Sequence, residues 1–319
     1  MMKEGIAIAF LGSVVVLSAS TAPHTIEECW EPDTPCSLAP ERLHTGIWGS
    51  AADDVWVVGA SMPASTGTFA HWDGTTWTRG PTEDGPALWG VWGTARDDVW
   101  AVANRGMVLH RQQGVWKVSR SGATHDGALL GVWGGRSDDV WAVGVGGIIT
   151  HWNGATWSTT VADAAARTLV GVWGSGASEV WAVGKNGVVL HWDGLSWKAS
   201  SSGVRKPLFD VWGSGPRDVW AVGGRGIILH WDGLTWSSSA QYQTDVDLLG
   251  VWGSGPRDVW AVGGHGAILH WDGQTWTSVP SGTGETLHEI WGTGASDVWA
   301  VGRASTILHW DGRRWSLSP

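Results

Sequence analysis

Short runs of apolar residues alternate with turn residues along most of the chain, as the stretch from 208 to 239 shows. Within it, Trp220 and Val222 lie on one side of an alternating run, and Asp232-Gly233 separates the last two runs. Alternation with a period of two predicts β-strands, and an Asp-Gly pair between two such runs is a strong hairpin signal. The stretch therefore contains four predicted antiparallel strands, at 209–213, 218–223, 227–231 and 234–237.

This four-strand unit occurs seven times, and successive copies are 44, 41, 40, 39, 40 and 39 residues apart. A fixed period of this length indicates a repeat architecture. Four hairpin-connected strands per repeat are typical of one blade of a β-propeller. We therefore predict an all-β fold, a seven-bladed β-propeller with contiguous blades around a central channel. The first tryptophans of the blocks are Trp48, Trp92, Trp133, Trp173, Trp212, Trp252 and Trp291.

Three known families share parts of this pattern. Gly223-Gly224 after the second strand and Trp236 in the fourth resemble kelch repeats. Trp231-Asp232-Gly233, followed by Thr235-Trp236, resembles the Asp-box of sialidase-like and photosystem-assembly propellers, although it is one residue shorter. The succession of Val-Trp-Ala-Val, Trp-Asp-Gly and a final Trp also resembles the tectonin repeats of propeller lectins. The resemblance covers residues 43–319, and the families it includes bind sugars, bind proteins or cleave sialosides.

The composition fits a large aromatic core and argues against nucleic-acid binding. The 319 residues include 29 tryptophans, and each buried tryptophan removes roughly 150–250 Å² from water. The net charge is −10, from 30 acidic and 20 basic residues, and no run of lysines or arginines occurs. Because affinity for nucleic acid depends on neutralising phosphates, we expect no nucleic-acid partner. In block 2, Arg111 stands where the other blocks have a tryptophan.

The first residues have the pattern of an export signal. Lys3 precedes an apolar stretch over 5–17, and small residues follow up to Ala22. This stretch fits a signal peptide and is short for a membrane-spanning helix. We predict a signal peptide over 1–22 and a protein that is secreted, periplasmic or at the cell surface, with no membrane insertion once the signal is removed. An uncleaved membrane anchor is the alternative.

Residues 23–42 lack the periodic pattern and are predicted to be a linker. They contain four of the 12 prolines and both cysteines of the chain, Cys29 and Cys36. An even number of cysteines in an exported chain predicts a disulfide, which here would close a small loop. The propeller then covers 43–319, and we expect it to be a monomer.

Two recurring polar positions invite a metal-binding interpretation, but their placement favours a structural role. Each block has a histidine in its third strand and an acid two residues before its second-strand tryptophan. Equivalent positions on different blades lie on a circle, and the third strand belongs to the outer half of a blade, so these histidines are expected to be far apart. We predict no metal and no cofactor. The histidines are His71, His110, His151, His191, His230, His270 and His309.

The pattern offers no catalytic constellation. A sialidase needs an arginine triad, a tyrosine nucleophile and a carboxylate, whereas the only tyrosine, Tyr242, lies between blocks 5 and 6. No nucleophile elbow, phosphate-binding loop or metalloprotease helix occurs. We therefore predict that the protein is not an enzyme, and an Asp-box glycosidase-like remnant is the third-ranked interpretation.

Variation between the blocks concentrates on one predicted face. In a four-stranded blade, the turns between the second and third strands emerge on the same side as the connections between blades, and the other two turns recur almost unchanged. The variable turns carry a basic set that is compatible with an anionic ligand or an acidic partner, although tight turns also tolerate polar residues without function. The candidates are Asn104, Arg105, Lys185, Asn186, Arg225, His265 and Arg303, with Tyr242 in a connection.

Two acids nearer the axis also depart from the repeat. Five blocks have glycine at a first-strand position where block 5 has Asp210 and block 7 has Glu289, and His288 is adjacent. These residues are candidates to line the channel mouth and bind sugar hydroxyls or a cation, and a purely structural role is the alternative. We predict a non-catalytic propeller that recognises an extracellular carbohydrate through its variable face, with a kelch-type protein-interaction scaffold as the alternative.

Overall fold

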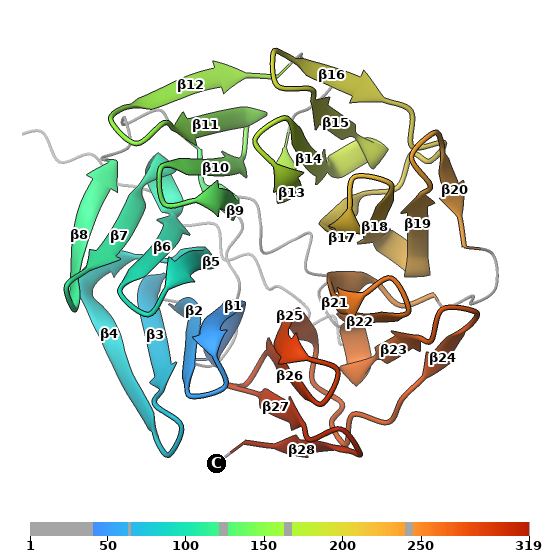
Figure 1. Ribbon diagram of the computed structural model, residues 1–319. Coiled ribbons are helices and arrows are strands. Elements are labelled where there is room, and N and C mark those ends of the chain that lie inside the picture. Colours follow the sequence, from blue (N-terminus) through green and yellow to red (C-terminus); the bar gives the residue numbers. More distant parts are fainter. Residues whose placement is uncertain (1–40, 63–64, 121–126, 163–167, 240–244, 319) are drawn as a thin grey trace, which may run out of the picture. The chain divides into compact units, whose positions relative to one another are not determined.

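The computed structural model describes residues 41–62, 65–120, 127–162, 168–239 and 245–318. They form seven four-stranded antiparallel sheets, and in every sheet the strands pair in chain order. The sheets surround a central opening like the blades of a propeller (Figure 1). The predicted seven-bladed all-β fold with contiguous blades is therefore confirmed. The predicted signal peptide, the Cys29–Cys36 disulfide and all but two residues of the predicted linker lie outside the described residues.

The first strand of each blade is the innermost and the fourth is the outermost (Figure 1). The first strands are β1 (Glu41–Ala51), β5 (Leu88–Ala95), β9 (Leu129–Arg136), β13 (Leu169–Gly176), β17 (Leu208–Gly215), β21 (Leu248–Gly255) and β25 (Leu287–Gly294). The second strands are β2 (Asp54–Met62), β6 (Asp98–Ala103), β10 (Asp139–Gly144), β14 (Glu179–Gly184), β18 (Asp218–Gly223), β22 (Asp258–Gly263) and β26 (Asp297–Gly302).

The third strands are β3 (Thr66–Trp72), β7 (Val108–Gln112), β11 (Ile148–Trp152), β15 (Val189–Trp192), β19 (Ile227–Trp231), β23 (Ile268–Trp271) and β27 (Ile307–Trp310). The fourth strands are β4 (Trp77–Pro86), β8 (Val115–Arg120), β12 (Trp157–Val161), β16 (Trp197–Ser200), β20 (Trp236–Ser238), β24 (Trp276–Ser278) and β28 (Trp315–Leu317). Four turns of 3-10 helix, η1 (Asn104–Gly106), η2 (Lys185–Gly187), η3 (Gly224–Gly226) and η4 (Gly264–Gly266), join second and third strands. In the described part of the chain, no helix is long and apolar enough to cross a membrane.

Neighbouring blades approach closely at the inner radius, and glycine makes this approach possible. A Cβ atom added to Gly213 would lie 2.7 Å from the ring of Trp173, in the preceding blade, and 2.6 Å from the carbonyl oxygen of Asp218. The same arrangement recurs where the last blade meets the first, between Trp291 and Gly49. The recurring Trp-Gly pair of the sequence is thus a packing device between blades.

Adding a methyl group at Gly213 is therefore expected to be costly. We expect Gly213→Ala to lower the free energy of unfolding by roughly 1–3 kcal/mol, because carbonyl and ring atoms leave no room for the new Cβ. Urea denaturation would measure the loss. Gly215→Ala in the same strand is the matched control, because a Cβ at Gly215 meets nothing within 4 Å. Equal losses in the two variants would show that close packing is not the cause.

Each second-strand tryptophan joins two blades. In blade 4, the buried Trp181 stacks on His191 of its own blade, with ring centroids 4.2 Å apart. Its ring also meets Trp236 of the next blade edge-to-face, at 5.3 Å and 86°. Contacts between tryptophans of neighbouring blades therefore continue around the ring, and they close it through Trp299, Trp72 and Trp77.

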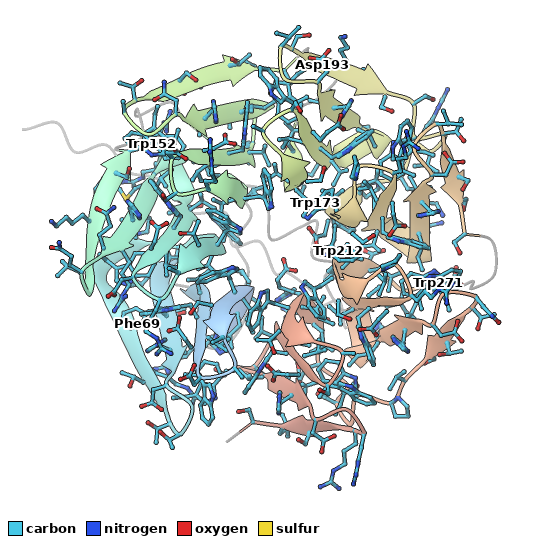
Figure 2. All side chains as sticks on the ribbon, in the orientation of Figure 1. Phe69, Trp152, Trp173, Asp193, Trp212 and Trp271 are labelled. Atoms are coloured by element: carbon cyan, nitrogen blue, oxygen red, sulfur yellow. The ribbon has the colours of Figure 1, made fainter. Side chains whose placement is uncertain are left out.

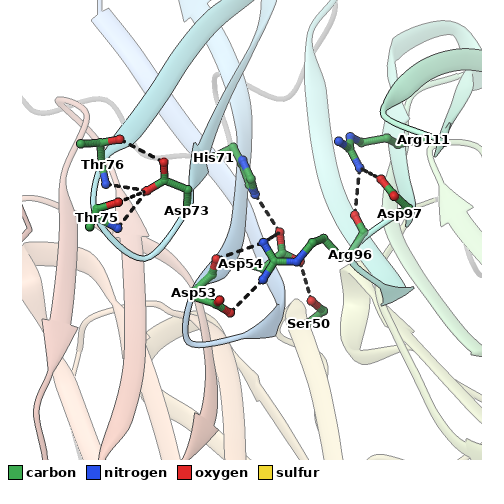
Figure 3. A network of polar contacts seen from close by, with 10 residues as sticks. All are labelled: Ser50, Asp53, Asp54, His71, Asp73, Thr75, Thr76, Arg96, Asp97 and Arg111. Atoms are coloured by element: carbon green, nitrogen blue, oxygen red, sulfur yellow. Dashed lines mark hydrogen bonds and ion pairs between the residues drawn. The ribbon is translucent and has the colours of Figure 1, made fainter.

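The recurring histidines and acids complete these stacks. In blade 1, His71 Nε2 donates a hydrogen bond to Asp54 Oδ1 at 2.7 Å, and the Ser50 hydroxyl donates to Asp54 Oδ2 at 2.5 Å (Figure 3). In all seven blades the corresponding distance from histidine to acid is 2.5–2.8 Å. Each recurring histidine thus has a partner within its own blade, as expected for a structural role.

Candidate binding face

The turns between second and third strands share one face with the connections between blades. The N–H of Gly224 in η3 donates to the carbonyl of Pro207, just before the first strand of the same blade, at 2.9 Å. In the connection from blade 4 to blade 5, the buried Ser202 hydroxyl donates to the carbonyl of Gly187 in η2 at 2.6 Å. We call the surface formed by these turns and connections the turn face.

Four predicted site residues lie at exposed turn tips in an unusual backbone conformation. Arg105, Asn186, Arg225 and His265 have φ angles of 60°, 63°, 54° and 54°. Residues with a side chain rarely adopt this left-handed region, and each such residue costs about 1–2 kcal/mol. Blade 3 has Gly146 at this position, with φ of 79°. Asparagine and histidine tolerate this region better than most residues, so the strain falls mainly on Arg105 and Arg225. Their long polar side chains at a position that suits glycine point to a role outside folding.

The other predicted turn residues are less exposed. Asn104 is half-buried, and its Oδ1 accepts a hydrogen bond from Trp89 Nε1 at 2.7 Å, which holds the indole. Lys185 and Arg303 occupy the equivalent half-buried position. In blade 7 the exposed tip is Ala304, so Arg303 lies one residue before the tip. Tyr242 lies outside the described residues.

Exposed polar residues, most of them basic, form an arc on the turn face over blades 4 to 6. The connection between blades 4 and 5 adds two exposed cations to the tip residues. The backbone N–H of Arg225 donates to Asp247 Oδ1 at 2.7 Å, and the Arg225 side chain is exposed at the tip of its turn. We call this set the basic arc: Asn186, Arg205, Lys206, Arg225 and His265.

A β-bulge places one extra residue in every first strand, at the end that meets the turn face. The pairing of first and second strands skips one residue in each blade, as between Leu208 and Asp210. A bulge changes the direction of the side chain of the extra residue. These residues sit in the innermost strands, next to the central opening, and five of them are apolar. We call them the bulge ring: Thr45, Trp89, Leu130, Val170, Phe209, Leu249 and His288.

Asp210 and Glu289 follow two of the bulges and bond to the inner edges of the sheets. Asp210 Oδ2 accepts the N–H of Val251 in the next blade at 2.9 Å, and Glu289 Oε1 accepts the N–H of Ile290 at 3.1 Å. Burial raises the pKa of Asp210 to about 7, although the N–H groups of Val251 and Val211 oppose the shift. Burial and the nearby charge of Asp210 raise the pKa of Glu289 well above its usual range. The pair therefore carries less than two full negative charges at neutral pH.

His288 lies at the interface that closes the ring. Its Nδ1 donates to the carbonyl oxygen of His44 at 2.8 Å. His44 in blade 1 is equivalent to Leu208 in blade 5. His44 pairs with Gly59 of the second strand, and Leu208 pairs with Gly223 of the second strand. The His44 ring is 4% exposed, and within the described residues neither of its nitrogens has a hydrogen-bond partner. The sequence pattern did not single out His44, although alignment of the blocks places it at a leucine position.

Burial lowers the pKa of both histidines to about 4. Arg79, His288 and Arg42 contribute to the lowered pKa of His44, and Arg303 contributes to that of His288. Both rings are therefore neutral at pH 7. Among the described residues, no group of three or more His, Cys, Asp or Glu side chains is placed to hold a metal ion.

Comparison with known proteins gives matches in three-dimensional structure. No family model and no curated protein sequence matches the chain. YCF48 from Cyanidioschyzon merolae is similar with a TM-score of 0.67 and 18% identity, over 86% of this chain and 97% of that chain. YCF48 bound to D1 peptide has a TM-score of 0.66 and 17% identity, over 86% and 94%. The WD40 β-propeller domain of Doa1 has a TM-score of 0.68 and 11% identity, over 88% and 94%.

At these identities the matches show the fold alone. The chain is similar in fold to YCF48 and WD40 propellers, and these matches do not single out tectonin, kelch or Asp-box propellers. The function must therefore be argued from the site itself.

Proposed function

We propose that this protein is a non-catalytic binding module whose turn face takes an acidic segment of a partner protein. The observation that carries the proposal is the basic arc. Its three exposed cations are Arg205 and Lys206 in the connection between blades 4 and 5 and Arg225 in the turn of blade 5, on a chain with a net charge of −10. Complementary charge favours an acidic partner and disfavours a basic one. The left-handed tips sit in short, hydrogen-bonded turns, so little ordering is needed on binding.

The bulge ring supplies the apolar part of this interface. Trp89 and Phe209 are half-buried beside the channel end of the turn face, and Asn104 fixes the Trp89 ring. Protein interfaces combine an apolar centre with a polar rim, and aromatic anchors contribute much of the affinity. YCF48, a similar propeller, has been solved with a bound peptide. This likeness supports a peptide as the type of ligand.

Carbohydrate recognition on this face remains a prediction. Sugar-binding sites commonly offer an accessible aromatic surface with a few polar groups around it. In the described part of the turn face, Trp89 and Phe209 are half-buried, and the Trp89 indole N–H is occupied by Asn104. We therefore favour the protein-interaction alternative. Export of the protein also remains a prediction.

Charge reversal on the basic arc is expected to weaken binding of acidic peptides. We expect Arg205→Glu together with Arg225→Glu to raise the Kd at least about tenfold, because two attractive contacts become repulsive. Fluorescence anisotropy with matched acidic and basic peptides, each carrying one aromatic residue, would measure this change.

The control is Arg313→Glu together with Arg314→Glu. Both arginines are exposed in the β27–β28 hairpin, on the opposite face from the turn face. Their reversal changes the net charge equally and is expected to leave the Kd nearly unchanged. Equal weakening by the two double variants would overturn the proposal in favour of a general charge effect. Absence of acidic-peptide binding to the native chain would also overturn it.

A further inference from the structure

The hairpin between the third and fourth strands is nearly constant, except in blade 2. In blade 5, Asp232 Oδ1 accepts the N–H groups of Leu234 and Thr235, both at 2.8 Å. Blade 2 instead has Arg111, Gln112 and Gln113 where the repeat has Trp-Asp-Gly. The other blades use the same side-chain cap, from Asp73, Asn153, Asp193, Asp272 and Asp311.

Arg111 compensates for the missing tryptophan by packing inward. Its guanidinium lies 4.9 Å from the ring of Trp56, and its Nη1 donates to Asp97 Oδ1 at 2.5 Å (Figure 3). The cation thus replaces one ring of the stack between blades 1 and 2. The packing of Arg111 between the blades therefore explains this substitution. It does not explain Gln112 and Gln113, which replace Asp-Gly in the same hairpin.

Gln112 and Lys117 lack the ion pair that blade 4 has at the same two positions. In blade 4, Lys198 Nζ lies 2.5 Å from Asp193 Oδ2 within the hairpin. Lys117 holds the same position in blade 2, but Gln112 replaces the acid. Among the described residues, neither side chain has a recorded hydrogen bond or ion pair. In blade 2 the Lys117 ammonium group and the Gln112 amide are therefore available to bind a ligand.

These groups line a cleft of about 420 Å³ between blades 2 and 3. Trp152 of β11 forms part of the opposite wall and lies at the outer side of the ring (Figure 2). In blade 4 the equivalent Trp192 donates its Nε1–H to the carbonyl of Ala177 at 3.1 Å, whereas Trp152 Nε1 has no such bond to the described residues. The cleft therefore combines a half-buried indole with an unpaired cation and an amide.

Ser119 and Asp138 are further polar residues of the lining, together with His110 and Ser137. Ser119 Oγ accepts the indole N–H of Trp157 at 3.1 Å, so its own hydroxyl hydrogen points elsewhere. The Asp138 carboxylate is 3.3 Å from Arg136 Nε, which offsets its charge. Lys117 is then the cation of the cleft that no carboxylate in this lining neutralises.

We propose that this cleft binds a pyranose that carries a carboxylate, such as a uronic acid residue of a glycan. A pyranose has an apolar C–H face that suits the indole of Trp152, and its hydroxyls suit Gln112 and Ser119 as donors and acceptors. The carboxylate of the sugar meets Lys117. The volume matches the lower part of the range for small-ligand sites, about 300–1,000 Å³. This site is separate from the turn face and does not depend on the function proposed for it.

The probes are glucuronate, glucose as its neutral counterpart, and a glycan array read with the full chain. We expect saturable binding of glucuronate or of glycans that contain it, and at least about tenfold weaker binding of glucose by isothermal titration calorimetry. Lys117→Met and Gln112→Asp are expected to raise the Kd for glucuronate about tenfold or more. Both changes are at the surface, and the second restores the residue of the repeat, so folding is expected to persist.

Trp152→Ala is expected to abolish binding, and Trp192→Ala at the next interface is its matched control. Arg225→Glu on the turn face is expected to leave the Kd unchanged. The proposal would be overturned if the native chain bound neither glucuronate nor glucose nor any glycan of the array. Equal affinity for glucuronate in the native chain and in the Lys117→Met and Gln112→Asp variants would overturn it as well.

Discussion

Leucine in place of His44 is expected to make the propeller much less sensitive to acid. The pKa of His44 is about 4 in the folded protein, against 6.5 for an ordinary histidine. Between these values the unfolded chain binds a proton that the folded chain does not, so stability falls as the pH falls from 6.5 to 4. The difference of 2.5 units corresponds to about 3 kcal/mol at most. His44→Leu removes this loss.

The same variant is also expected to be more stable at pH 7.5. A buried polar group without a hydrogen bond costs about 1–3 kcal/mol, and leucine at this position removes that cost. Urea midpoints measured from pH 7.5 to pH 4 would show both effects. The reciprocal variant Leu208→His tests the mechanism, because Leu208 is fully buried at the equivalent position of blade 5. If His44→Leu lost as much stability as the native protein between pH 7.5 and pH 4, His44 would not be the cause of the acid sensitivity.

The largest gain at high pH is expected from Asp210→Asn. Burial raises the pKa of Asp210 from 3.8 to about 7. The folded chain therefore keeps a proton that the unfolded chain releases, so stability falls as the pH rises from 3.8 to 7. The loss is about 4 kcal/mol at most, and this is an upper limit because the side chain is half-buried rather than fully buried. Asparagine keeps an acceptor for the N–H of Val251 and has no charge to bury.

Thermal unfolding at pH 4 and pH 8 would test this prediction. Asp210→Asn should match the native protein at pH 4 and exceed it at pH 8. Asp218→Asn is the control, because the pKa of Asp218 is shifted in the opposite direction. Burial acts to raise this pKa, but hydrogen bonds from His230 and Ser214 outweigh burial and lower it. That variant should lose stability at pH 8. A lower melting temperature for Asp210→Asn at pH 8 would show that the carboxylate is a net stabilising group.

A residue that costs stability at a position where five blades have glycine is a candidate for function. Asp210 and Glu289 meet this condition at the channel. On the turn face, Arg225 is a comparable case, because it has the left-handed conformation at a tip where blade 3 has Gly146. The block alignment could locate both sets because each departs from a repeat. It could not show that Asp210 accepts a hydrogen bond from Val251, since that bond joins two blades.

The bulge ring was harder to predict. Trp89 is visible in the sequence as an extra aromatic residue, but an extra residue in a first strand changes neither the period of the repeat nor the alternation around it. The bulge is recognised only when the ladder between first and second strands is known, as in the skipped residue between Leu208 and Asp210. The cleft at Trp152 has the same origin, because its walls come from different blades.

The sequence by itself determined the number of blades, their four strands, their order and the face on which variation gathers. These features depend on periodicity and turn chemistry within about 40 residues, which are local properties. The tertiary structure decided which side chains meet across blades. His288 bonds to His44, 244 residues away, and Trp77 bonds to Ser318, 241 residues away. The repeat makes all blades alike, so the sequence of one block does not show which residues meet in another. Positions that depart from the repeat, such as His288 and His44, become neighbours only because the last blade packs against the first.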